Sequence, residues 1–275
     1  MSINVDGLGK ELDPIPFSWT PKDGILYNIG IGATELEYVW ENKLEILPTF
    51  AVVPPFNMLA ASVGLMQANP MMLLHGEQKI IMKKTPIPNE AKAVTTGKIS
   101  ELYDKGKGAL YRVYCETKTE DGEPLFDNIF SIFVRGEGGF GGDKGPEAGN
   151  NPPDREPDKV IEYQTLPIQN LIYRLSGDIN PLHVDPSFAK LAGFDKPILH
   201  GLCSFGFAGR AVIEGMLDGE ADKLREYEVR FRNVVFPGQK LITKMWKEGK
   251  GRCVLEAHTD DGRMCIANAA ATWEE

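Results

Sequence analysis

The sequence is 275 residues long, which is enough for one large domain or for two domains of about 100–150 residues each. Hydrophobic residues make up 42% and charged residues 25%, as is ordinary for a globular protein. The formal net charge of −9 argues against a nucleic-acid partner, because phosphate backbones are bound by basic surfaces.

The ends of the chain and its cysteines predict a cytoplasmic location. Residues 1–7 contain neither the basic nor the apolar region of a secretory signal. No apolar run reaches transmembrane length, so no membrane partner is expected. Residues 271–275 do not match the peroxisomal Ser-Lys-Leu signal. The four cysteines lack Cys-x-x-Cys spacing, which predicts reduced thiols and no zinc site.

The first half of the chain begins with segments that lack a clear periodicity. Residues 1–24 are rich in Pro, Asp and Gly and are predicted to form an extended arm. Residues 25–32 hold too many glycines for a good helix or strand, and no Gly-Lys-Ser/Thr follows to make a P-loop. Residues 57–67 are mostly apolar and follow two prolines, which predicts a buried helix.

Strand-like runs follow the predicted helix, and the last two flank a hairpin turn at residues 120–122. These runs are residues 77–82, 93–102, 110–118 and 125–134. Residues 136–158 hold almost no core-forming side chains, which predicts a linker. The pattern then starts again, with a short helix over 187–193 and an apolar helix over 202–216. Strand-like runs complete the chain at residues 227–235, 240–246, 252–258 and 264–273.

The two halves are weakly similar to each other, which indicates an internal repeat. A Gly-Lys-Gly sequence followed by a Thr-Glu/Asp-Asp-Gly turn occurs at residues 106–122 and again at 249–262. Residues 27–34 align with residues 173–180. Each half is therefore predicted to be one long helix followed by an antiparallel sheet, which places the protein in the α+β class.

The polar chemistry of the sequence is concentrated in Gly-Asp-Ile-Asn-Pro-Leu-His, which ends at His183. Asp178, Asn180 and His183 supply a carboxylate, an amide and an imidazole, which together can hold and deprotonate one water molecule. Gly201 opens the second apolar helix, where a backbone N–H can stabilise an anion that develops on a carbonyl oxygen. The first half carries Gly32 in place of the aspartate, so one active site per chain is expected.

Each of these residues also has a structural interpretation. Asp178 alone would more often cap a turn, and His183 alone would more often be a hydrogen-bonded structural histidine. Their joint spacing favours catalysis, because a plain turn has no use for that histidine. For Asn180, holding the loop competes evenly with a role in turnover. Gly201 also lets the chain enter the helix, and His200 is interpreted as structural.

These motifs resemble the signature of the (R)-specific enoyl-CoA hydratases, the hydratase 2 or MaoC-like family of hot-dog proteins. The resemblance implies a double hot-dog fold, in which each repeat has a long helix wrapped by an antiparallel sheet. Residues 1–135 would form a degenerate repeat that binds the acyl chain and CoA. Residues 136–158 would be the linker, and residues 159–275 the catalytic repeat. A fused pair of this kind is expected to form a homodimer.

The resemblance also implies four substrate-binding positions. His75 and Gly76 lie in Leu-His-Gly-Glu-Gln, Lys105 lies in Asp-Lys-Gly, and Phe231 lies in an Arg-Phe strand motif. Lys105 has a rationale of its own, since CoA brings phosphates that need a cation, although a solvated turn lysine is equally expected. The methionine-rich stretch of the first half, which includes Met66 and Met71, is expected to line a pocket for the acyl chain.

The implied reaction is the reversible hydration of a trans-2-enoyl-CoA to a (3R)-3-hydroxyacyl-CoA, with no metal or redox cofactor. Asp178 is favoured as the base and His183 as its partner, and Gly201 would hold the oxyanion. Two rivals stay open. An acyl-CoA thioesterase also uses a carboxylate and water in a hot-dog pocket, and a decayed site would leave a non-catalytic acyl-CoA-binding subunit.

Overall fold

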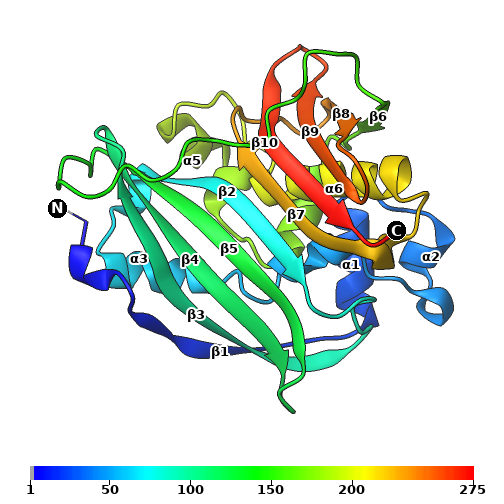
Figure 1. The fold of residues 1–275 in the computed structure, drawn as a ribbon, viewed down its shortest axis with the longest axis horizontal. Coiled ribbons are helices and arrows are strands. Elements are labelled where there is room, and N and C mark those ends of the chain that lie inside the picture. Colours follow the sequence, from blue (N-terminus) through cyan, green and yellow to red (C-terminus); the bar gives the residue numbers. More distant parts are fainter. Residues whose placement is uncertain (1–2) are drawn as a thin grey trace.

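A computed structural model describes residues 3–275. Within this range ten strands form one continuous antiparallel sheet, with the helices behind it in the view of Figure 1. The strands are β1 (Glu11–Trp19), β2 (Leu73–Met82), β3 (Ala91–Asp104), β4 (Gly108–Thr119), β5 (Pro124–Arg135), β6 (Lys159–Gln164), β7 (Leu224–Phe231), β8 (Lys240–Lys247), β9 (Arg252–Thr259) and β10 (Met264–Trp273).

The order of the strands shows the internal repeat directly. The sheet runs β1-β3-β4-β5-β2-β7-β10-β9-β8-β6. Counted outward from the centre, each half places its second, fifth, fourth, third and first strand in that order. The central pair, β2 and β7, joins the halves through the register Glu77↔Arg230 to Ile81↔Glu226. The α+β class and the double hot-dog fold are therefore confirmed.

The helices are α1 (Pro21–Gly30), α2 (Leu36–Val39), α3 (Met58–Met66), α4 (Gln169–Tyr173), α5 (Pro186–Leu191) and α6 (Gly201–Met216). Helix α6 is the central helix of the second half, and eleven of its sixteen residues are buried. Its glycines allow close packing, since a Cβ on Gly206 would lie 2.3 Å from Ile31 Cγ2. Close approach of this kind offsets the low helix propensity of glycine.

The predicted extended arm is wrong over residues 3–24, while residues 1–2 lie outside the described residues. The prediction that residues 25–32 avoid regular structure is also wrong. Strand β1 pairs with β3, and α1 begins directly after it. Thr20 and Asp23 form a capping box at the start of α1. Its Gly24 is required by packing, because a Cβ there would lie 2.4 Å from Ile46 Cδ1. Strand β6 was also missed.

The predicted helix of the first half is present as α3, but it has only nine residues. Its Met58 and Met66 are fully buried in a second core, which packs against β3, β4 and β5. Met71 and Met72 follow in a 3-10 turn and are 65% and 45% exposed. Residues 136–158 contain no helix or strand. No helix among residues 3–275 is both long and apolar enough to cross a membrane.

Candidate active site

The polar motif forms a loop between two short 3-10 turns, η5 (Arg174–Ser176) and η6 (Pro181–His183). Gly177 allows the turn, with φ at +126°. The Asn180 side chain accepts a hydrogen bond from the Leu182 N–H at 3.0 Å and so caps η6. Its own N–H donates to Asp178 Oδ1 at 3.2 Å. Asn180 therefore shapes the loop that carries the aspartate.

Asp178 and His183 face each other inside this loop. Asp178 Oδ2 lies 3.9 Å from His183 Nε2, and the two side chains are 17% and 9% exposed. The other ring nitrogen, His183 Nδ1, lies 2.9 Å from the carbonyl oxygen of Ile198, which assigns its proton to Nδ1. The Nε2 lone pair of the neutral ring is then free. A gap of 3.9 Å is too long for a direct hydrogen bond and suits a bridging water.

Burial changes the protonation of both groups. It raises the pKa of Asp178 above its usual range, although the neighbouring His183 opposes the shift. Burial also lowers the pKa of His183, against the opposing charge of Asp178. Both shifts favour the neutral forms and bring the two pKa values toward each other. A smaller difference between the two pKa values lowers the free-energy cost of moving a proton between these groups.

Gly201 is the first residue of α6, where the N–H groups lack acceptors within the helix. A Cβ built on Gly201 would lie 3.5 Å from the ring of Phe231. The Phe231 ring lies 5.1 Å from the ring of His75, measured between centroids. Burial lowers the pKa of His75 to about 4, and its Nε2 has no partner within the described chain. The structure thus connects Gly201, Phe231 and His75, with Gly76 beside them in β2.

Lys105 is not connected to this group by any contact in the structure. It lies in the turn between β3 and β4, where its ammonium lies 5.3 Å from the Tyr103 ring centroid and donates to the Lys144 carbonyl. The neighbouring Asp104 carboxylate accepts hydrogen bonds from Gly106, Gly139 and Gly141, each at 2.8 Å. These hydrogen bonds hold the turn to the segment at residues 139–141, while a role of Lys105 toward CoA stays a prediction.

His200 belongs to the site, although sequence reasoning set it aside as structural. Its ring stacks on His183 with centroids 3.7 Å apart and planes at 26°. Its Nε2 lies 3.0 Å from the carbonyl oxygen of Asp178. The signal in the sequence was its position directly before Gly201.

Among residues 3–275, Asp178, His183 and His200 form a group whose side chains could together hold a metal ion. One ligand atom each from Asp178, His183 and His200 lies within 4.8 Å of the others. Imidazoles bind metals through lone pairs in the plane of the ring. Because the two rings are stacked, these lone pairs cannot meet at one ion unless a ring rotates. As arranged, the trio fits a water-binding role better than a metal centre.

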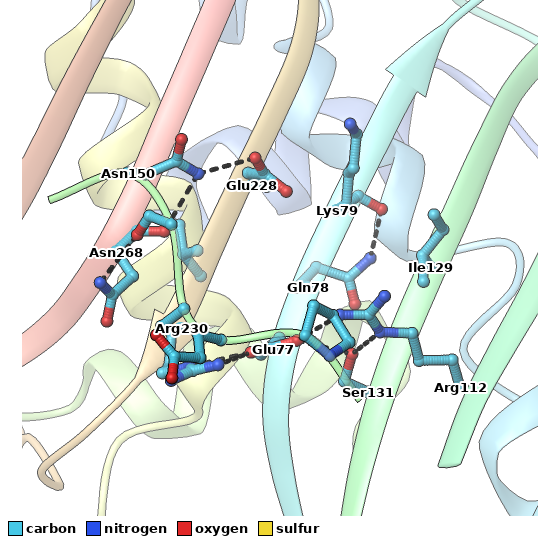
Figure 2. Close-up of a pocket in the computed structure, with 15 residues that line it drawn as sticks. Glu77, Gln78, Lys79, Arg112, Ile129, Ser131, Asn150, Glu228, Arg230 and Asn268 are labelled. Carbon is cyan, nitrogen blue, oxygen red and sulfur yellow. Dashed lines mark hydrogen bonds and ion pairs between the residues drawn. The ribbon is translucent and has the colours of Figure 1, made fainter. Parts of the chain in front are cut away.

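A separate cavity of about 310 Å³ lies on the opposite face of the central strands (Figure 2). Arg230 precedes Phe231 in β7, so its side chain points to the other side of the sheet. There Glu77 accepts hydrogen bonds from Arg230 Nε at 2.8 Å and from Arg112 Nη2 at 3.2 Å. Burial alone would raise the pKa of Glu77, but these arginines lower it below its usual range. The cluster links β2, β4 and β7 behind the site.

Fold and site together define a MaoC-like double hot-dog protein. The profile of the "MFE-2 hydratase 2 N-terminal domain" matches residues 17–136, and that of the "MaoC like domain" matches residues 148–262. A probable enoyl-CoA hydratase 2 from Dictyostelium discoideum is 41% identical over 97% of this chain and 95% of its own length. The chain therefore belongs to the hydratase 2 family.

Two further comparisons agree with this assignment. The peroxisomal hydratase-dehydrogenase-epimerase of Neurospora crassa is 47% identical over 97% of this chain, which spans only 30% of that larger protein. The crystal structure of a MaoC-like dehydratase from Phytophthora capsici superposes with a TM-score of 0.90 at 32% identity. That match covers 99% of this chain and 98% of the other.

Proposed function

We propose that this chain is an enzyme that hydrates trans-2-enoyl-CoA reversibly to (3R)-3-hydroxyacyl-CoA. The observation that carries the proposal is the Asp178–His183 pair. Asp178 Oδ2 lies 3.9 Å from His183 Nε2, and the pair lies beside the start of α6. Relatives with hydratase 2 names support the same reaction class. The acyl-CoA thioester is the substrate, so CoA is not a separate cofactor.

In this proposal one water is held between Asp178 Oδ2 and His183 Nε2. Its oxygen attacks C3 of the enoyl thioester, and Asp178 takes one of its protons as the base. The negative charge moves to the thioester oxygen, where the Gly201 N–H stabilises it. The proton taken from water returns to C2 through the pair, so the catalyst ends the cycle unchanged. The carboxylate and the imidazole move every proton, so the reaction needs no metal or redox cofactor.

His75, Gly76 and Phe231 are proposed to line the acyl-CoA site, since His75 packs on Phe231 and Phe231 packs on Gly201. Lys105 is proposed to bind a phosphate of CoA. The first half, residues 1–135, is proposed to select the acyl chain. Met66 is excluded from that surface because it is fully buried in the core, whereas Met71 is exposed.

The rival reaction within the same fold is thioester hydrolysis, in which the same water attacks the carbonyl carbon and releases CoA. A third candidate is a subunit that binds acyl-CoA without reaction. Incubation with crotonyl-CoA and with a longer enoyl-CoA separates them. The proposal requires loss of the enoyl-thioester absorbance without free thiol. Thiol release would favour the thioesterase, and no change with either substrate would contradict the proposal.

Two other predictions from the sequence stay predictions. A homodimer is proposed, and light scattering of the purified protein tests it. A cytoplasmic location is the other, although several relatives are named as peroxisomal. Fractionation of cells that produce the full-length protein would decide between the two compartments.

A further inference from the structure

His200 contacts both Asp178 and His183 and directly precedes Gly201. It is fully buried, and it is the N-cap residue of α6, directly before Gly201. One face of its ring stacks on His183, and the ring of Tyr173 lies 5.1 Å away. Its Nε2–H donates to the carbonyl oxygen of Asp178 at 3.0 Å. One imidazole thus touches both members of the pair and adjoins the oxyanion glycine.

The protonation of His200 excludes it from proton transfer. Burial, together with the neighbouring His183, lowers its pKa to about 2, so the ring is neutral in the folded protein. Its Nε2–H donates to the Asp178 carbonyl oxygen, and its Nδ1 is buried without a hydrogen-bond partner among the described residues. A buried acceptor without a donor destabilises the folded state. An apolar ring would remove that cost but would leave the Asp178 carbonyl without its donor, so the two effects offset each other and stability alone does not explain the histidine.

The backbone at Asp178 lies in an irregular part of the loop. Asp178 lies outside the two 3-10 turns, between Gly177, whose φ is +126°, and Ile179, which is 70% exposed. Within residues 3–275 the Asp178 carbonyl accepts no other hydrogen bond. The bond from His200 is therefore the direct connection between this carbonyl and the start of α6.

We infer that His200 is a positioning residue, which sets the distance between the water held by Asp178 and His183 and the N–H of Gly201. The inference rests on the proposed function. The water attacks C3 and the Gly201 N–H binds the thioester oxygen of the same conjugated group. The distance between the water and this N–H must therefore match the distance between C3 and the thioester oxygen. A misplacement of about 1 Å can lower turnover by about 100-fold.

Two substitutions distinguish the role of the His200 hydrogen bond from the role of its aromatic ring. His200→Phe keeps the aromatic contact with His183 and Tyr173 but removes the donor and the unpaired Nδ1. We expect kcat to fall about 10- to 100-fold, with the KM for the enoyl-CoA within about threefold of wild type. We expect the melting temperature to stay within about 5 °C, because the lost hydrogen bond is offset by the removed unpaired acceptor.

His200→Gln tests the same inference from the opposite side. The glutamine Nε2 occupies about the position of the imidazole Nε2 and can donate to the Asp178 carbonyl, although the ring is lost. We expect kcat to recover to within about fivefold of wild type, against the 10- to 100-fold loss in His200→Phe. A purely structural role would instead lower the melting temperature of both variants and leave kcat of the folded fraction unchanged.

His258→Phe is the matched control, because His258 lies in β9 and pairs with Glu256. It should leave kcat and KM unchanged. If folded His200→Phe retains wild-type kcat, or if His200→Gln is no better than His200→Phe, the inference is overturned. Asp178→Asn distinguishes this result from failure of the proposed function. An active Asp178→Asn enzyme would refute the hydratase mechanism itself, whatever His200 does.

Discussion

Substitution of Gly201 by alanine separates the two interpretations of this glycine, the oxyanion donor and the small residue required for packing. A Cβ at Gly201 would lie 3.5–3.6 Å from three atoms of the Phe231 ring, which is ordinary van der Waals contact. The protein therefore has room for the methyl group. Alanine is favoured over glycine in a helix by up to about 1 kcal/mol, so the free energy of unfolding should stay equal or rise slightly.

Activity should change in the opposite direction. The methyl group touches Phe231, where the thioester is proposed to lie, and it narrows the approach to the Gly201 N–H. One oxyanion donor contributes about 3–4 kcal/mol. If the methyl group moves the thioester carbonyl partly away from the Gly201 N–H, kcat/KM should fall at least about tenfold. The measurements are urea unfolding for stability and initial rates of enoyl-CoA hydration for kcat/KM.

Gly64→Ala provides the control, because Gly64 lies in α3 with nothing within 4 Å of the added Cβ. It should stabilise the protein to a similar extent without changing the rate of hydration. If Gly201→Ala is as stable as Gly64→Ala and also as active as wild type, then the Gly201 N–H does not contact the thioester. The oxyanion assignment would then be wrong.

Four further predictions concern the site and its substrate. Asp178→Asn and His183→Ala should each lower kcat by about 10²–10⁴-fold. The double variant should be little worse, because both groups serve one water, and additive losses in steady-state rates would contradict this. His75 has a folded pKa of about 4 against 6.5 in the unfolded chain, so its stabilising contribution is present above pH 6.5 and is lost as the pH falls toward 4. Urea unfolding should show that wild type loses about 3 kcal/mol more than His75→Phe over that range, and an equal loss in the two proteins would rule out this source. Titration with a 3-hydroxyacyl-CoA should show one site per chain, and two sites would refute this assignment. Met71→Trp should lower the rate with long enoyl-CoA substrates more than the rate with crotonyl-CoA, and equal effects on all chain lengths would refute a role of Met71 in the acyl pocket.

The fold was predictable where the sequence repeats itself. Most strands and α6 have the expected periodicity, and the two halves share their turn sequences, so the double hot-dog fold followed. Helix α1 was missed because its glycines have low helix propensity, and propensity does not reveal that Gly24 packs under Ile46. The edge strands β1 and β6 were missed because their burial depends on neighbours that are distant in the sequence.

The site was predictable to the extent that it is local. Asp178, Asn180 and His183 lie within six residues, so one loop had to bring them together. The contacts of His75 with Phe231 and of His200 with the Asp178 carbonyl join separate elements, which only the folded chain can show. For His200 the residue type was visible in the sequence, but the partner that gives it a role was not.

The most direct test of the central claim is the configuration of the product formed from a trans-2-enoyl-CoA. The purified full-length protein should consume the enoyl-thioester absorbance without releasing thiol. Chiral chromatography of the hydrolysed product should then give the (3R)-3-hydroxy acid. A (3S) product, release of free CoA, or an unchanged substrate with both short and long chains would contradict the account.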